Sequence, residues 1–110
     1  MRDYTIYVKD MVAAIESIEA FIAGMSFEEF AKDDKTLSAV PRKLEVLGEA
    51  SKQVPEKIRA KHPDIPWREM AGMRDKLIHF YFGVDEALVW QTITNKIPDV
   101  KRRLQSILRG

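Results

Sequence analysis

The sequence predicts an all-α fold, an antiparallel bundle of about four or five helices with short connections. A single domain is expected to span residues 1–110. Apolar residues recur at spacings of three and four over most of the chain, which is the pattern of one buried helix face. No segment alternates apolar and polar residues as a half-buried strand does, and no internal repeat or low-complexity linker separates the periodic segments.

The first periodic segment predicts one long amphipathic helix followed by a short one. Its apolar face consists of Tyr7, Met11, Ala14, Ile15, Ile18, Phe21, Ile22 and Met25. Asp3 is expected to cap the start of the long helix and Gly24 to end it. Ser26 is followed three residues later by Glu29, a capping-box pattern that opens the short helix.

A second long helix is expected after the polar turn "KDDK", with Val40, Leu44, Leu47 and Val54 on its apolar face. Gly48 would let a neighbouring element approach closely. Pro41 leaves two starts open. A helix that begins near Thr36 would lose one backbone donor at Pro41 and kink, whereas a helix that begins near Val40 would hold the proline in its first turn.

Prolines punctuate the next part of the chain, "VPEKIRAKHPDIPW". We expect a short helix from Pro55 to Lys61 and then a turn, with Pro66 at the first position of the following helix and Gly83 at its end. The last segment predicts one helix, or two halves joined near Pro98. Its apolar positions are Leu88, Trp90, Ile93, Ile97, Val100, Leu104 and Leu108.

Composition excludes several classes of function. The chain has no cysteine, and its two histidines, His62 and His79, lack the spacing of paired zinc ligands, so we expect neither a metal nor a cofactor. The N-terminal stretch "MRDYTIYVKD" is charged and holds no long apolar run. This predicts a cytoplasmic protein with no signal peptide and no membrane span.

Charge is unevenly distributed along the chain although the net charge is only +1. Residues 1–34 carry 3 basic and 8 acidic side chains, whereas residues 35–110 carry 15 basic and 9 acidic ones. The basic part could attract a polyanion. The alternative, which we favour on charge alone, is the solvated surface of a helical bundle.

The stretch "AGMRDKLIHFYFG" places four polar groups on an otherwise apolar segment. Arg74 and Tyr81 are seven residues apart and share one helix face, while Asp75 and His79 are four apart and share the neighbouring face. Arg74 and His79 lie about 140° apart on an ideal helix, so one straight helix does not aim both at the same atom. They would converge if the helix unwinds near His79, or across a symmetric dimer.

These residue types suit RNA cleavage without a metal. A histidine can take the proton of the 2′-hydroxyl near neutral pH, and an arginine presents a fork that fits phosphate oxygens. The alternative is structural: Arg74 and Asp75 would form surface ion pairs, and His79 and Tyr81 would be core residues with satisfied polar tips.

"RDKLIHFY" matches the pattern R-x4-H-x-Y, and longer blocks around it, "MSFEEF", "RKLEVLGEASKQVPE" and "HPDIPWREMAGMRDKLIHFYFGVD", occur in the same order. With these blocks the chain resembles the HepT-like toxins of the HEPN superfamily from Asp3 to Leu108. The resemblance implies a dimeric helical bundle that is a metal-independent ribonuclease acting on RNA. It also implies a cognate partner, a minimal nucleotidyltransferase antitoxin that transfers AMP to the motif tyrosine.

Each motif residue takes its expected role from this resemblance. Arg74 and His79 correspond to the catalytic pair, and Tyr81 to the tyrosine that receives AMP. Asp75 stands where the superfamily often has a polar residue, commonly Asn, and is expected to support the site by orienting His79. Pro41 departs from the usual helix pattern. The alternative function is a non-catalytic nucleotide-binding or adaptor subunit of a nucleotidyltransferase complex; the intact Arg74–His79 pair favours the enzyme.

Three weaker features complete the predictions. Trp67 and Arg68 could flank a nucleotide, although Trp67 is better interpreted as a packing anchor at a helix start. His62 is expected to be exposed in a turn. The basic run Lys101–Leu104 could contact phosphates, but we favour a role in complementing the C-terminal end of the helix dipole.

Overall fold

The computed structural model of the chain describes residues 3–73, residue 76 and residues 86–110. Every regular element within these ranges is helical, which confirms the predicted all-α class. The elements are α1 (Thr5–Ile22), α2 (Phe27–Lys32), α3 (Asp34–Gln53), α4 (Glu56–Lys61), α5 (Trp67–Ala71), α7 (Glu86–Gln91), the π-helix η1 (Thr92–Lys96) and α8 (Ile97–Arg109).

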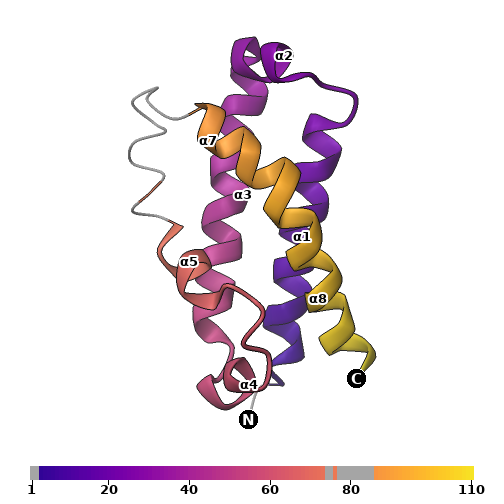
Figure 1. Cartoon of the computed structure of the whole chain (residues 1–110), viewed down its shortest axis with the longest axis vertical. Helices are drawn as coiled ribbons and strands as arrows, with labels where there is room; N and C mark the ends of the chain where they lie inside the picture. Colours follow the sequence, from indigo (N-terminus) through magenta and orange to yellow (C-terminus); the bar gives the residue numbers. More distant parts are fainter. Residues whose placement is uncertain (1–2, 74–75, 77–85) are drawn as a thin grey trace.

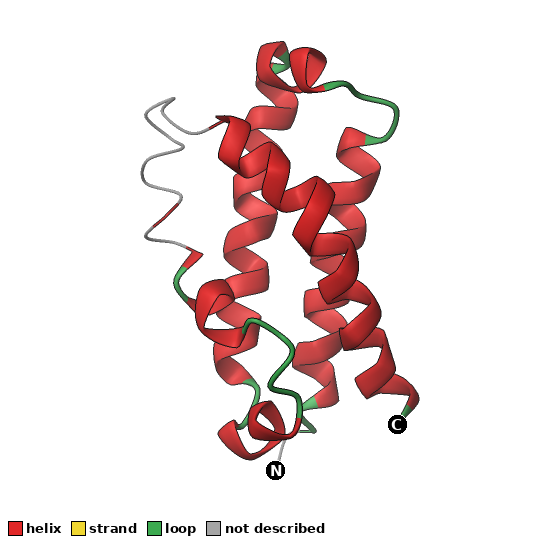
Figure 2. Cartoon of the chain, viewed as in Figure 1, coloured by secondary structure: helices red, strands yellow, loops and turns green. Residues whose placement is uncertain are grey.

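Three long helices form the body of the bundle. Helix α1 packs along α3 and along α8 and runs antiparallel to both (Figure 1). Helices α2 and α7 lie at one end of the bundle, and α4 lies at the other end, with α5 on the flank of α3. Only short loops join the described helices from α1 to α5 (Figure 2). No helix in the described ranges is long and apolar enough to cross a bilayer.

The core fills the space between α1, α3 and α8. Its largest fully buried side chains on these helices are Met11, Ile15, Ile18, Leu44, Leu47 and Leu104. These residues belong to the apolar faces expected from the helical spacing. The face of α1 is wider than predicted, because Val8 and Val12 are also buried. Burial of such side chains supplies most of the free energy that holds a helical bundle together.

Local signals set the ends of the first two helices, as predicted. The backbone N–H of Ser26 donates to Glu29 Oε1 at 2.9 Å, and the N–H of Glu29 donates to Ser26 Oγ at 3.2 Å, which is a complete capping box. The N-cap of α1 is Tyr4, one residue after the predicted Asp3, although Asp3 Oδ1 still accepts from the Thr5 N–H at 3.1 Å. Gly24 has a φ of 78° and follows the end of α1, where a side chain would be strained.

Helix α3 begins at Asp34, close to the predicted start near Thr36 and well before the alternative start near Val40. The expected "KDDK" turn is reduced to Asp33, which ends α2 and whose side chain accepts from the Thr36 N–H at the start of α3. The start near Val40 is therefore wrong, and Pro41 lies inside the helix. Pro41 has no N–H for the carbonyl of Leu37. Its side chain is buried, so packing compensates for the lost hydrogen bond.

The C-terminal segment forms two α-helical halves that join through a π-helix. The N–H of Ile97 donates to the Thr92 carbonyl, five residues back, at the end of η1. Pro98 then occupies the first turn of α8. Because Pro98 cannot donate to the carbonyl of Thr94, ordinary α-helical bonding fails at this point. The predicted joint near Pro98 is confirmed. The short helix predicted over 55–61 is also confirmed as α4, with Pro55 at its N-cap.

Candidate functional site

The four predicted site residues, Arg74, Asp75, His79 and Tyr81, lie outside the described residues, as does the predicted helix end at Gly83. Their roles therefore stay predictions. The structure shows instead how the chain is held before and after them. Helix α5 and Met73 come before the motif, and α7 comes after it.

Helix α5 is anchored at its first residue. Pro66 is the N-cap, so the helix begins one residue later than predicted. The Trp67 side chain is only 8% exposed, and its Nε1 donates to the His62 carbonyl at 2.9 Å. This buried, hydrogen-bonded indole confirms the packing anchor and leaves no free ring face for a nucleotide. His62 is half-buried, so its expected full exposure is wrong.

Helix α5 also lies unusually close to α3. A Cβ added at Gly48 would stand 2.5 Å from the carbonyl oxygen of Met70, and 3.6 Å from the Cβ of Met73. Met70 is 2% exposed and Met73 is buried in the same core. The predicted close approach at Gly48 is thus confirmed, and the approaching element is the one that leads into Arg74.

Aromatic packing anchors the chain after the motif. The Trp90 ring of α7 lies 5.0 Å from the Phe30 ring and 6.2 Å from the Phe27 ring, measured between centroids. Such tilted pairs are a favourable arrangement of aromatic rings. Sequence spacing placed Trp90 on an apolar face but gave no signal that α2 would be its partner.

One ion pair links the two flanks of the motif directly. Lys96 Nζ of η1 lies 3.5 Å from Glu69 Oε2 of α5. Both side chains are more than half exposed, at 66% and 54%, so solvent screens the pair and its stabilisation is small. The pair shows that α5 and η1 are neighbours on the bundle.

The three basic residues near the start of α8, Lys101, Arg102 and Arg103, all form ion pairs. Lys101 Nζ contacts Glu19 Oε1 at 2.7 Å, and Arg103 binds both Asp99 and Asp64. Hydrogen bonding from Arg103 lowers the pKa of the Asp99 carboxyl, and the same contact raises the pKa of Arg103. The predicted role in complementing the helix dipole is wrong, because these residues lie in the first two turns of α8.

No group of three or more His, Asp or Glu side chains that could hold a metal ion occurs within residues 3–73 and 86–110.

An all-helical bundle with R-x4-H-x-Y between α5 and α7 defines a HEPN-like domain. The chain belongs to the ribonuclease HepT-like family, whose profile matches residues 11–107. It is 49% identical over 106 residues to a probable ribonuclease HepT of Thermococcus cleftensis, covering 96% of both chains. It is 43% identical over 103 residues to a putative RNase of Caldanaerobacter subterraneus subsp. tengcongensis, covering 94% of this chain and 92% of the relative. It is 44% identical over 108 residues to a putative RNase of Methanocaldococcus jannaschii, covering 98% and 93%. No solved structure matches the chain.

Proposed function

We propose that this protein is a metal-independent endoribonuclease, the toxin of a pair whose antitoxin is a minimal nucleotidyltransferase. The observation that supports it most is the family match, which covers residues 11–107 and so includes the motif from Arg74 to Tyr81. The relatives reported above are named as ribonucleases, and the chain aligns with almost their whole length. The chain keeps both residues that the cleavage chemistry needs, Arg74 and His79.

In this mechanism His79 takes the proton of the RNA 2′-hydroxyl. The 2′-oxygen attacks the adjacent phosphorus, the bond from phosphorus to the 5′-oxygen breaks, and the leaving oxygen receives a proton. The products are a 2′,3′-cyclic phosphate and a free 5′-hydroxyl. Arg74 stabilises the negative charge that builds on the phosphate in the transition state. Asp75, which precedes His79 by four residues in the sequence, orients it in this proposal.

The protein acts as a homodimer in this proposal, because Arg74 and His79 lie about 140° apart on one ideal helix. Two copies of the segment 74–81 lining one cleft would bring an arginine of one copy to a histidine of the other. Within each copy, the packing of α5 on α3 and of Trp90 of α7 on Phe30 of α2 fixes the helices that come before and after the segment 74–81.

The antitoxin silences the enzyme by transferring AMP from ATP to the Tyr81 phenol in this proposal. The phenol oxygen attacks the α-phosphorus of ATP, pyrophosphate leaves, and the phenol proton passes to solvent or a base. The attached phosphodiester adds bulk and negative charge beside the RNA phosphate site, and Arg74 can pair with it instead of with substrate.

The test compares cleavage of a mixed-sequence RNA by the wild type, His79→Ala and His62→Ala, each with EDTA. His62 is the matched control, because it is the other histidine of the chain and its bond to Trp67 uses only the backbone carbonyl. His79→Ala is expected to lose on the order of 10²–10⁴ in rate, while His62→Ala keeps the rate. Full activity of His79→Ala, or loss of wild-type activity in EDTA, contradicts the mechanism. No cleavage by the wild type would favour the adaptor subunit instead.

A further inference from the structure

Helices α4 and α5, with the turn between them, form a small lobe on the bundle, residues 56–71. The Trp67 indole fastens the two helices together through the His62 carbonyl, and Ile65 is buried under the turn. The lobe is tied to the rest of the bundle from two sides. Asp64 binds Arg103 of α8, and Glu69 pairs with Lys96 of η1.

These two ties leave the lobe with an excess of positive charge. It contains four cations, Lys57, Arg59, Lys61 and Arg68, and three carboxylates, of which Asp64 and Glu69 are already paired with cations of other elements. None of the four cations has a carboxylate partner among the described residues. Three of them are exposed: Lys57, Lys61 and Arg68.

The cations of the other elements are either paired or more scattered. Lys32, Lys35, Lys43 and Arg109 also form no ion pair with the described residues, but they are spread over α2, α3 and α8. Lys101, Arg102 and Arg103 of α8 are all paired with carboxylates. The groove between α1 and α3 is lined by three carboxylates, Asp10, Glu45 and Glu49, and one guanidinium, so it repels a polyanion. Lys32 and Lys35 stand among four carboxylates, Glu28, Glu29, Asp33 and Asp34, whereas the lobe gathers three exposed, unpaired cations in the stretch that precedes the motif in the sequence.

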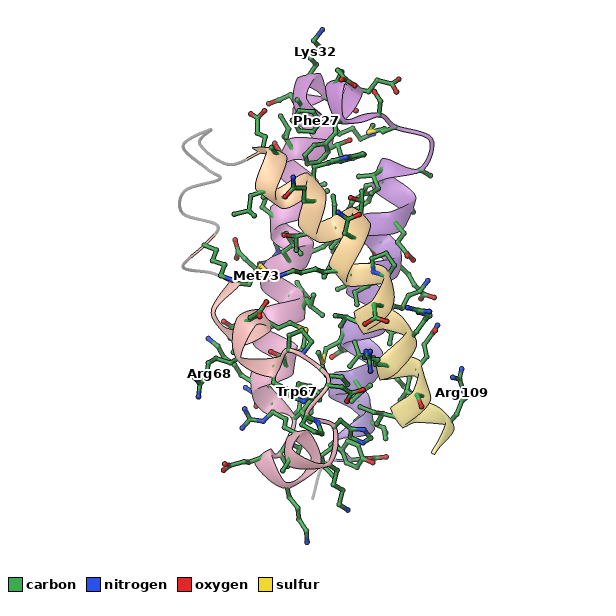
Figure 3. All side chains as sticks on the ribbon, in the orientation of Figure 1. Phe27, Lys32, Trp67, Arg68, Met73 and Arg109 are labelled. Carbon is green, nitrogen blue, oxygen red and sulfur yellow. The ribbon has the colours of Figure 1, made fainter. Side chains whose placement is uncertain are left out.

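We propose that the exposed cations of the lobe, Lys57, Lys61 and Arg68, bind backbone phosphates of the RNA away from the scissile bond. This inference rests on the proposed ribonuclease function. Arg68 precedes the motif residue Arg74 by only six positions and projects away from the bundle at α5 (Figure 3). Lys57 and Lys61 are four residues apart and share one face of α4. Contacts of this kind are made to the phosphates alone, so they do not depend on the base sequence of the RNA.

Phosphate binding of this kind has a distinct signature. Each neutralised phosphate of a single strand releases counterions, so affinity falls with salt by a slope of about 0.7 per contact in logarithmic terms. Three contacts contribute a slope of roughly 2. Removing them is expected to weaken binding about ten- to hundredfold near 0.1 M salt and to have little effect near 1 M salt.

The test measures binding of a fully 2′-O-methylated single-stranded RNA, which cannot be cleaved through its 2′-oxygen, across a series of salt concentrations. The lobe variant is Lys57→Gln, Lys61→Gln and Arg68→Gln combined. The matched control is Lys32→Gln, Lys35→Gln and Arg109→Gln combined, which removes the same charge at other exposed sites (Figure 3). The lobe variant is expected to lose affinity and salt slope as stated, while the control keeps both. Unchanged melting temperatures confirm that both variants are folded.

Several outcomes would overturn the proposal. An equal loss of RNA affinity in both variants would mean that net charge alone acts. Full RNA affinity in both variants would mean that the lobe does not contact RNA. Loss of antitoxin binding with RNA binding intact would assign the lobe to a protein partner. The binding assay is independent of cleavage. If the wild type binds RNA through the lobe but cleaves none, the proposed ribonuclease function is wrong, whereas the proposal that the lobe binds RNA still holds.

Discussion

Replacement of Gly48 by alanine tests whether the contact between α3 and α5 sets the position of the motif. The new Cβ would stand 2.5 Å from the Met70 carbonyl oxygen, whereas ordinary contacts begin near 3.4 Å. The obstructing atom belongs to the backbone and cannot rotate away as a flexible side chain would. Helix α5 must therefore move outward, or α3 must distort.

The size of the effect follows from two opposing terms. Overpacking against a backbone atom costs about 3 kcal/mol, and alanine recovers about 1 kcal/mol of helix propensity relative to glycine. The net loss is about 2 kcal/mol. For a chain of this length each kcal/mol corresponds to roughly 4 °C in melting temperature, so Gly48→Ala is expected to melt roughly 8 °C below the wild type.

Gly72→Ala is the matched control, since it makes the same chemical change at the C-cap of α5, the helix on the other side of the contact. A Cβ there would meet the Arg68 carbonyl oxygen at 3.4 Å, an ordinary contact, so its melting temperature should equal or slightly exceed that of the wild type. Ribonuclease activity adds a second readout. A displacement of α5 by about 1 Å should lower the cleavage rate of Gly48→Ala by up to ~10²-fold, measured below its melting temperature. If Gly48→Ala melts with or above Gly72→Ala, the close contact does not constrain α5 and the reasoning fails.

Three further predictions concern modification, assembly and pH. Incubation with the cognate nucleotidyltransferase and ATP is expected to add one or more AMP groups to Tyr81, seen in the intact mass, and to stop cleavage; a Tyr81→Phe variant that is still silenced would refute this. Sedimentation at micromolar concentration is expected to show a dimer. A monomer that still cleaves RNA would contradict the proposed cleft between two copies of the chain. Asp99→Asn should lower the melting temperature slightly at pH 7. Because the hydrogen bond from Arg103 depresses the pKa of Asp99 in the folded state, that stabilisation is present above the ordinary carboxyl pKa of about 4 and is lost as the pH falls through the lower folded value. The difference in melting temperature between wild type and Asp99→Asn should therefore vanish in strong acid. A difference that persists there would show that the Asp99–Arg103 pair does not act through charge.

Features that depend on neighbouring residues were predictable from the sequence. The capping box at Ser26 and Glu29 and the helix stop at Gly24 each need only a few consecutive residues, so their patterns predicted them correctly. The close approach at Gly48 was predictable because only a glycine in an apolar helix face leaves room for a backbone. The sequence did not predict that the element approaching Gly48 would be α5.

Features set by distant residues were beyond such patterns. The pairing of Lys101 with Glu19 joins residues far apart in the chain, so the basic run looked like an end-of-helix signal. Pro41 sits inside α3 because its buried side chain outweighs a local preference that favoured a later start. For the candidate site, the motif and the family resemblance supplied every residue, and the structure contributes the anchors on both sides, Trp67 and Trp90.

The π-helix η1 gives the C-terminal half of the bundle a tolerance that an unbroken α-helix lacks. Val89, Ile93 and Ile97 are all buried although each is four residues from the next, a spacing that would rotate by about 80° over the three positions of an α-helix. The wider π turn absorbs that rotation, as if one residue had been inserted into a regular helix. Shortening Thr92–Lys96 by one residue would remove the extra residue of the π turn, so the helix would lack only the hydrogen bond that Pro98 cannot donate, while α7 and α8 keep their packing. The chain can therefore be one residue shorter at this joint while both helices stay packed.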